Sequence, residues 1–157
     1  MPPRPVITVT RKLPAEVERE LAGAFDARLN ELDVPLTPDR LQHALRASDG
    51  LICTVSDRLD AAALGVEPLR AGILANYGVG YDHIDVAAAK ARGLVVTNTP
   101  GVLTDATAEL AVTLLLMVAR RAGAGERELR AGRWTGWRPT HLLGTGVTGK
   151  TLGIVEM

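Results

Sequence analysis

Short apolar runs alternate with amphipathic segments over the first two thirds of the chain. Runs rich in Val, Ile and Leu are typical of strands buried in a parallel sheet. The predicted strands are Val6–Thr10, Ala27–Asn30, Leu51–Val55, Ala71–Asn76 and Leu94–Thr97. Because helical segments separate them, we expect an α/β fold with right-handed crossovers. The predicted arrangement is a flavodoxin-like, five-stranded sheet with strand order 2-1-3-4-5.

Helix signals stand between the first strands. Pro14 predicts the start of one helix, and Thr37, followed by Pro38, predicts the start of the next. Ser48–Gly50 is typical of a turn. Apolar residues recur at helical spacing in both helices, at Val17, Leu21 and Ala24 in the first and at Leu41, Ala44 and Leu45 in the second.

Two further helices are predicted later in this region. Asp57 and Asp60 flank a short helix, and Asp85 can cap a helix over Val86–Arg92. Gly93 is suited to end that last helix, because glycine readily takes the left-handed conformation common there.

A glycine loop follows the fourth predicted strand, with Gly78 and Gly80 one residue apart. Such spacing predicts positive φ at both positions and N–H groups turned outward, an arrangement that binds an anion. Ligands of open α/β sheets lie beyond the carboxyl ends of the strands, which is where this loop falls. The alternative is that the glycines only make a tight turn.

The residues around this loop form a family signature. The stretch NYGVGYDHIDVAAAKARGLVVTNTPGVLTDATAELAVTLLL, starting at Asn76, resembles the D-2-hydroxyacid dehydrogenases and above all their glyoxylate/hydroxypyruvate reductase branch. The resemblance runs from about Ile7 onward but covers only the N-terminal half of such an enzyme. It implies an NAD- or NADP-dependent enzyme that reduces a small 2-keto acid such as glyoxylate or hydroxypyruvate.

The resemblance also assigns roles to residues. It implies that the backbone N–H groups of Val79 and Gly80 receive the substrate carboxylate, while Asn76 holds the loop. Thr107 matches a cofactor-contacting position, although an ordinary hydrogen bond at a helix start is an equal alternative. It thus assigns to the substrate-binding site the residues Val55, Ser56, Asn76, Gly78, Val79, Gly80 and Trp137.

The character of the chain changes after Pro100. Thr104 or Asp105 can cap a helix that becomes apolar on every side over Leu110–Ala119, which predicts burial all round. A five-stranded domain offers no place for such a helix, so we expect an interdomain or subunit interface. The resemblance implies a homodimer. The expected domains are 1–99, which binds substrate, and 100–157, which holds the interface helix, an arm and the start of a nucleotide-binding domain.

Trp134 and Trp137 follow a polar segment, Arg120–Arg133, that we expect to form a helix or arm with a solvated surface. Two tryptophans so close together indicate hydrophobic anchoring of the arm. The resemblance instead implies that Trp137 reaches across the dimer toward the substrate pocket of the partner subunit.

Gly144–Thr151 reads GTGVTGKT and satisfies the P-loop pattern letter for letter. A P-loop needs a strand before it and a helix after it. Here a loop precedes the motif and a predicted strand, Leu152–Val155, follows it, so we expect a turn into a nucleotide-binding domain. The resemblance would place the first glycine of a dinucleotide fingerprint at Glu156, where a carboxylate would repel a pyrophosphate.

The chain contains no catalytic group that matches the family. The resemblance implies an Arg, a Glu and a His beyond residue 157, and His43, His83 and His141 match none of them. We therefore expect the 157 residues alone to be inactive and not to bind the cofactor, with no metal site. Two alternatives stay open, a non-catalytic protein-interaction module of the same fold and a P-loop nucleotide hydrolase.

Composition excludes several other classes. Lys and Arg number 18, as do Asp and Glu, so nothing indicates nucleic acid or an anionic membrane as partner. Cys53 is the single cysteine and indicates an inert core thiol in a reducing cytoplasm. No apolar signal core is visible at the N-terminus. Leu110–Ala119 is too short to cross a bilayer, which needs about 20 apolar residues.

Overall fold

The computed structural model describes residues 3–155, which divide into two units between Val102 and Leu103. The first unit is an α/β fold with one parallel sheet in the order β2-β1-β3-β4-β5, which confirms the predicted order. Its strands are β1 (Val6–Val9), β2 (Asp26–Arg28), β3 (Gly50–Cys53), β4 (Ile73–Asn76) and β5 (Val95–Thr97).

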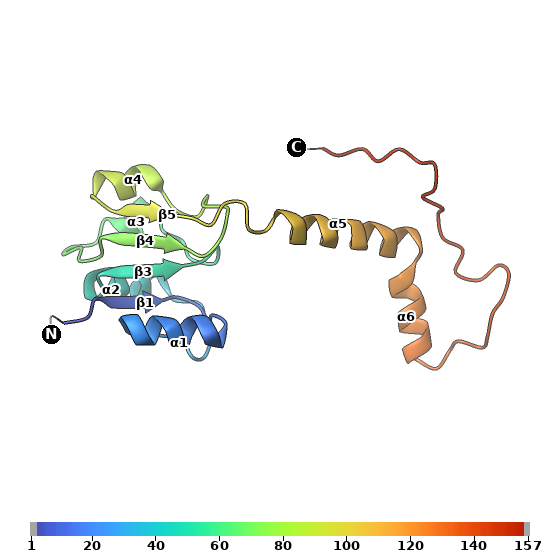
Figure 1. Cartoon of the computed structure of the whole chain (residues 1–157), viewed down its shortest axis with the longest axis horizontal. Helices are drawn as coiled ribbons and strands as arrows, with labels where there is room; N and C mark the ends of the chain where they lie inside the picture. The colour runs from blue at the N-terminus through green and yellow to red at the C-terminus, as the bar shows by residue number, and fades with distance from the viewer. Residues whose placement is uncertain (1–2, 156–157) are drawn as a thin grey trace. The chain divides into compact units, whose positions relative to one another are not determined.

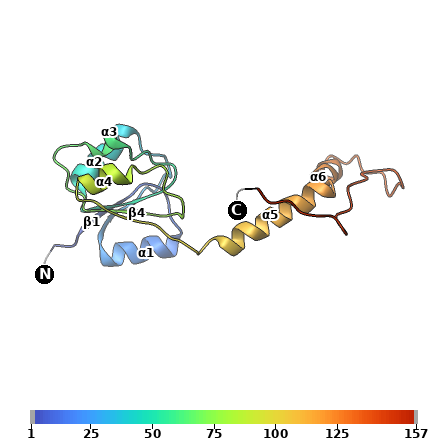
Figure 2. The ribbon, with the colours of Figure 1, turned by 90° about the horizontal axis from the view of Figure 1, so that it is seen from above.

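Helices cover the two faces of this sheet unequally. Helices α2, α3 and α4 lie on one face and α1 on the other, as Figure 1 and the turned view in Figure 2 show. Their bounds are α1 (Ala15–Ala24), α2 (Pro38–Ala47), α3 (Ala61–Leu64) and α4 (Val86–Ala91). The hydrophobic core lies on the face with three helices and includes Leu41, Leu45, Leu51, Leu64 and Leu74.

Side-chain caps begin three of these helices. The Thr37 hydroxyl accepts a hydrogen bond from Arg40 N, while the carboxylates of Asp60 and Asp85 accept from Ala63 N and Ala88 N. Each cap satisfies a backbone N–H that has no partner within its helix. The predicted helix start at Thr37 and the predicted cap at Asp85 are therefore confirmed, and Asp60, which was predicted only to flank a short helix, caps α3.

The structure corrects both ends of β3. Gly50 is the first residue of the strand and not part of a turn, and a Cβ there would lie 2.7 Å from Ile73 Cγ2, so only glycine fits this close strand pairing. Thr54 leaves the strand because its N–H donates to Asp57 Oδ2 at 2.8 Å. Asp57 is buried and holds this strand end through that hydrogen bond, whereas the sequence predicted that it flanks a helix.

The second unit contains α5 (Thr104–Ala119) and α6 (Ala122–Arg130), separated by Arg121 at φ 56°. The cap position of α5 is Leu103, which makes no side-chain cap bond, so the prediction of Thr104 or Asp105 as the cap is wrong. The expected burial of Leu110–Ala119 does not occur within the chain, since α5 has no buried residue.

The residues after α6 form neither helix nor strand up to residue 155. The strand predicted over Leu152–Val155 is absent there, because an apolar run becomes a strand only when another strand pairs with its backbone. Thr145 N donates to Ala119 O at 2.7 Å, which ties this segment to α5. Glu156 lies outside the described residues. No described helix is both long and apolar enough to cross a membrane.

Candidate functional site

The candidate site is the loop over residues 77–81 and its neighbours at the carboxyl edge of the sheet. All five strands are parallel, so the loops that follow β1, β3, β4 and β5 emerge at one edge. In open α/β sheets this edge is where ligands bind. The geometry of the loop decides what it can bind.

Asn76 anchors the loop from beneath. It is the last residue of β4 and is 2% exposed. Its Nδ2 donates to Gly78 O at 3.1 Å and to Gly80 O at 2.8 Å. Its Oδ1 lies 3.1 Å from His83 Nε2, so the Nε2 tautomer of His83 completes the hydrogen bonding of the buried amide. Both ends of the Asn76 side chain are thus occupied, as expected of a residue that holds the loop.

Residues after β5 bind the same loop. Asn98 Nδ2 donates to Val79 O at 2.9 Å, and Thr99 N donates to Gly78 O at 3.0 Å. The carbonyl groups of residues 78–80 are therefore all directed into the protein and hydrogen-bonded.

The N–H groups of the loop are the complementary half of this arrangement. Gly78 N donates to Asn76 O at 3.0 Å and is occupied. Within residues 3–155, the N–H groups of Val79 and Gly80 have no acceptor. Val79 is 38% exposed, so this part of the loop is open to solvent. Consecutive unoccupied N–H groups form a positively polarised site suited to a carboxylate.

The predicted backbone of the two glycines is wrong. Neither Gly78 nor Gly80 has a positive φ, whereas Gly93 and Gly101 do. The side chain of Asn76 fixes the loop instead, because it binds the carbonyl groups on either side of Val79. A Cβ added at Gly80 would meet nothing within 4 Å, so glycine there leaves open space beside the N–H groups.

Val55 and Ser56 lie in the loop after β3, beyond the strand end at which they were predicted. Val55 is 70% exposed, and its Cγ1 lies 3.7 Å from the position a Cβ at Gly78 would take. The Ser56 hydroxyl is exposed and hydrogen-bonded to Thr54 Oγ1 at 2.9 Å. The structure thus brings Val55 next to the glycine loop, with Ser56 adjacent in sequence.

Arg11 is a residue of this edge that the sequence analysis missed. Its Nη1 donates to Ser56 Oγ at 3.1 Å, and its Nε and Nη2 bind the carboxylate of Asp33 at 2.8 and 3.1 Å. These hydrogen bonds from Arg11, with one from Lys12 N, lower the pKa of Asp33 to about 2. Its position in the sequence could have indicated this role, because Arg11 directly follows the first predicted strand.

Cys53 and the possible metal ligands are the other candidate parts of a site. Burial raises the pKa of the Cys53 thiol to about 12, so this cysteine stays protonated at neutral pH. No group of His, Cys, Asp and Glu suited to a metal ion occurs in the described part of the chain.

Comparison with known proteins agrees with the fold. Residues 7–155 match the family model for the catalytic domain of D-isomer specific 2-hydroxyacid dehydrogenases. The chain belongs to this family. Glyoxylate reductase of Thermococcus litoralis is 42% identical over 97% of the chain, and human glyoxylate reductase/hydroxypyruvate reductase is 39% identical over 96%. The chain spans about half the length of the curated relatives it matches, 47% of each of these two.

Solved structures of dehydrogenases share the fold. A protein of Polaromonas sp. JS6 66, described as a D-isomer specific 2-hydroxyacid dehydrogenase, has a TM-score of 0.86 and 38% identity, over 94% of this chain and 46% of that one. The NADPH-dependent glyoxylate/hydroxypyruvate reductase of Sinorhizobium meliloti, solved with NADP and malonate, has a TM-score of 0.66 and 37% identity, over 83% and 39%.

Two of the predicted site residues belong to the second unit. Thr107 is exposed in the first turns of α5, and its N–H donates to Leu103 O at 2.9 Å, an ordinary helical hydrogen bond. Trp137 is 84% exposed and Trp134 is 53% exposed. Neither tryptophan is buried within the described part of this unit. The predicted hydrophobic anchoring of the arm by the two tryptophans is therefore not seen there.

The P-loop pattern does not form a P-loop in this family member. No helix follows Gly144–Thr151 up to residue 155, so the motif has no helix N-terminus to receive a phosphate. A Cβ at Gly144 would collide with Ala119 O, so this glycine serves close packing on α5.

Proposed function

We propose that this chain forms the substrate-binding part of an NAD(P)-dependent D-2-hydroxyacid dehydrogenase that reduces glyoxylate or hydroxypyruvate. The observation that supports this most directly is the pair of unoccupied N–H groups at Val79 and Gly80. Membership of the dehydrogenase family and two glyoxylate reductases among its relatives support the choice of substrate.

The substrate carboxylate binds to Val79 N and Gly80 N in this proposal. Hydrogen bonds from N–H groups to a carboxylate are charge-assisted and about twice as strong as neutral ones. Gly78, Val55 and Ser56 line the space beside these groups. Asn76 positions the loop but does not contact substrate, because its side-chain amide is already hydrogen-bonded within the protein. The loop would thereby orient the 2-keto carbon next to the bound carboxylate, and a nicotinamide, when bound, would supply the hydride for its reduction.

The described residues fit only a small part of a cofactor site. Thr107 is exposed and is the one residue to which we assign a cofactor contact. Binding of a dinucleotide requires a strand, a glycine turn and a helix, and residues 131–155 contain no helix or strand. The chemistry assigned to this chain is therefore confined to binding and orienting the substrate.

The apolar surface of α5 supports a homodimer as part of this proposal. Leu110, Val112, Leu114 and Val118 are each more than half exposed, which is uncommon for large apolar side chains on one helix. A second copy of the chain would cover them, and Trp137 would then approach the partner's substrate pocket. The single buried cysteine is compatible with the cytoplasm as the site of action.

Titration of the ¹⁵N-labelled chain with glyoxylate tests the proposal. We expect saturable shifts of the Val79 and Gly80 amide signals in proton–nitrogen spectra, while glycolaldehyde, a neutral compound of similar size, leaves them in place. Equal responses to both compounds, or unmoved loop signals with glyoxylate, would contradict carboxylate binding at this loop.

A second candidate function is a non-catalytic protein-interaction module, which the exposed apolar residues of α5 also favour. Its signature would be a stable complex with a different protein and loop amides that do not respond to glyoxylate. The same titration therefore separates the two candidates.

A further inference from the structure

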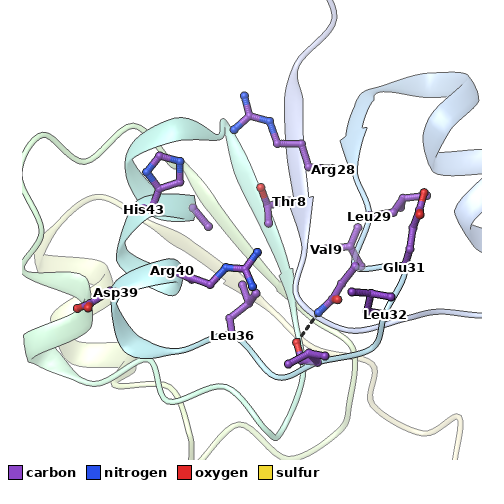
Figure 3. Close-up of a pocket in the computed structure, with 13 residues that line it drawn as sticks. Thr8, Val9, Arg28, Leu29, Glu31, Leu32, Leu36, Asp39, Arg40 and His43 are labelled. Atoms are coloured by element: carbon purple, nitrogen blue, oxygen red, sulfur yellow. Dashed lines mark hydrogen bonds between the residues drawn. The ribbon is translucent and has the colours of Figure 1, made fainter.

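A hollow of about 620 Å³ lies between β2 and α2 in the first unit, and Figure 3 shows its lining. None of its lining residues belongs to the loop over residues 77–81. Its volume falls in the range of about 300–1,000 Å³ that is usual for small-molecule sites. The residues that line it give it a definite chemistry.

Three basic side chains line this hollow: Arg28 from β2, and Arg40 and His43 from α2. Arg40 and His43 are three positions apart on the helix, so both are directed to one side of it. Arg28 is paired in register with Thr8 of β1, which also lines the hollow. The basic groups are thus carried by regular elements whose positions the sheet and core fix.

Arg28 and Arg40 differ from the other arginines of the first unit. Seven of them donate a side-chain hydrogen bond to the protein: Arg4, Arg11, Arg19, Arg46, Arg58, Arg70 and Arg92. Within residues 3–155, the guanidinium groups of Arg28 and Arg40 form neither a hydrogen bond nor an ion pair with the protein. The two arginines without a partner therefore line the same hollow.

The acidic residues of the hollow do not neutralise these groups. Asp39 and Glu31 also line it, but their carboxylates lie toward opposite sides of the view in Figure 3, away from Arg28. Neither forms an ion pair with Arg28 or Arg40 at 4 Å or less within the described chain. Both arginines are exposed, so a ligand that carries its own negative charge can reach their guanidinium groups.

Apolar residues form another part of the lining. Leu32 is 85% exposed and Val34 is 51% exposed, and both come from the loop between β2 and α2. Leu36 lies on the same loop and is half-buried. Exposed apolar side chains beside unpaired arginines favour a ligand that combines an anionic group with a carbon skeleton.

We propose that this hollow binds a phosphorylated small molecule, as a site separate from the substrate loop. The phosphate lies between Arg28 and Arg40, because a guanidinium group matches the geometry of a phosphate with two parallel hydrogen bonds. His43 adds a further donor, and the carbon skeleton packs against Leu32 and Val34. The proposal does not depend on the dehydrogenase function of the chain.

Titration calorimetry and proton–nitrogen spectra of the full chain test this site, with phenyl phosphate as the probe. We expect saturable binding that shifts the amide signals of Thr8, Arg28 and Arg40 and leaves those of Val79 and Gly80 in place. Inorganic phosphate, which lacks a carbon skeleton, should bind at least several-fold more weakly. R28Q and R40Q should each weaken phenyl phosphate binding about tenfold.

R19Q is the matched control, because it removes the same charge from an exposed arginine of α1 outside the hollow. It should bind phenyl phosphate as the unchanged chain does. Thermal unfolding of all three variants confirms that they are folded. Absence of saturable binding, or equal affinities of R28Q, R40Q and R19Q, would overturn the site. Equal affinity for phenyl phosphate and inorganic phosphate would overturn the proposed ligand class.

Discussion

Asn76 shows how one buried side chain can determine a binding loop. Its amide binds two carbonyl groups that flank Val79, and His83 occupies its oxygen. Because the carbonyl groups are held inward, the N–H groups of Val79 and Gly80 remain available for a ligand. A residue that makes no proposed contact with substrate therefore controls the candidate site.

We expect N76A to destabilise the fold by about 1–3 kcal/mol, since it leaves buried polar groups without partners. It should also abolish the glyoxylate-induced shifts of Val79 and Gly80. N30A is the control: Asn30 Nδ2 also makes two hydrogen bonds, to Thr10 O and Val34 O, both at 2.7 Å. Denaturant unfolding and the glyoxylate titration measure both effects. A glyoxylate response retained in N76A would contradict the role of Asn76.

Asp33 gives a prediction about pH at the same scale. Its hydrogen bonds with Arg11 and Lys12 N lower its pKa from 3.8 to about 2, so the ionised form stabilises the folded state. That stabilisation is present above about pH 4 and disappears as the pH falls toward 2. Denaturant unfolding between pH 5 and pH 2 should show a smaller loss of stability in D33N than in the unchanged chain.

Asparagine suits this test because it tolerates the left-handed backbone that Asp33 has, at φ 53°. Identical pH profiles for D33N and the unchanged chain would contradict the lowered pKa. Asp49 and Asp60 also have a lowered pKa, through hydrogen bonds from Arg70 and Ala63 N respectively. They act in the same direction, so D33N should retain part of the acid sensitivity.

At the scale of elements, the cap and the amphipathic face of α2 were the most predictable features. Thr37 caps α2, and Leu41, Ala44 and Leu45 are its buried residues, as the sequence indicated. These features are local, since a cap acts within one turn and the apolar spacing follows the helix period. The end of β3 was not predictable, because it depends on Asp57, whose carboxylate binds both Thr54 N and the Thr10 hydroxyl.

The cap of α4 can be tested by substitution. Asp85 Oδ1 accepts from Ala88 N at 2.9 Å, and we expect D85A to cost about 1 kcal/mol in unfolding free energy. D85N should cost much less, because asparagine is an equally good cap. Equal losses for the two variants in denaturant unfolding would show that the cap bond is not what stabilises α4.

At the scale of the molecule, we expect the apolar surface of α5 to bind a partner. Every large apolar residue from Leu110 to Val118 is exposed within the chain. The sequence predicted burial from the apolar character of the helix. Because this burial does not occur within the chain, we expect it to occur between copies of the chain. Burial of such a surface is favourable by about 25 cal/mol for each Å² removed from water.

We therefore expect the chain to self-associate, and L114E combined with V118E to shift it toward the monomer. L32E is the control, because Leu32 is 85% exposed but lies outside the second unit. Sedimentation velocity over a range of concentrations measures the effect. A soluble monomer at high concentration in the unchanged chain would contradict the proposed homodimer.

The sequence by itself determined the order of elements, the starts of α2 and α4 and the position of the glycine loop, because these follow from local spacing and backbone preference. It also carried the family resemblance. Only the tertiary structure decided that Asn76, rather than left-handed glycines, orients the loop amides, and that two unpaired arginines line one hollow. Such features depend on contacts between residues far apart in the sequence or on the absence of a partner, and no local pattern encodes either.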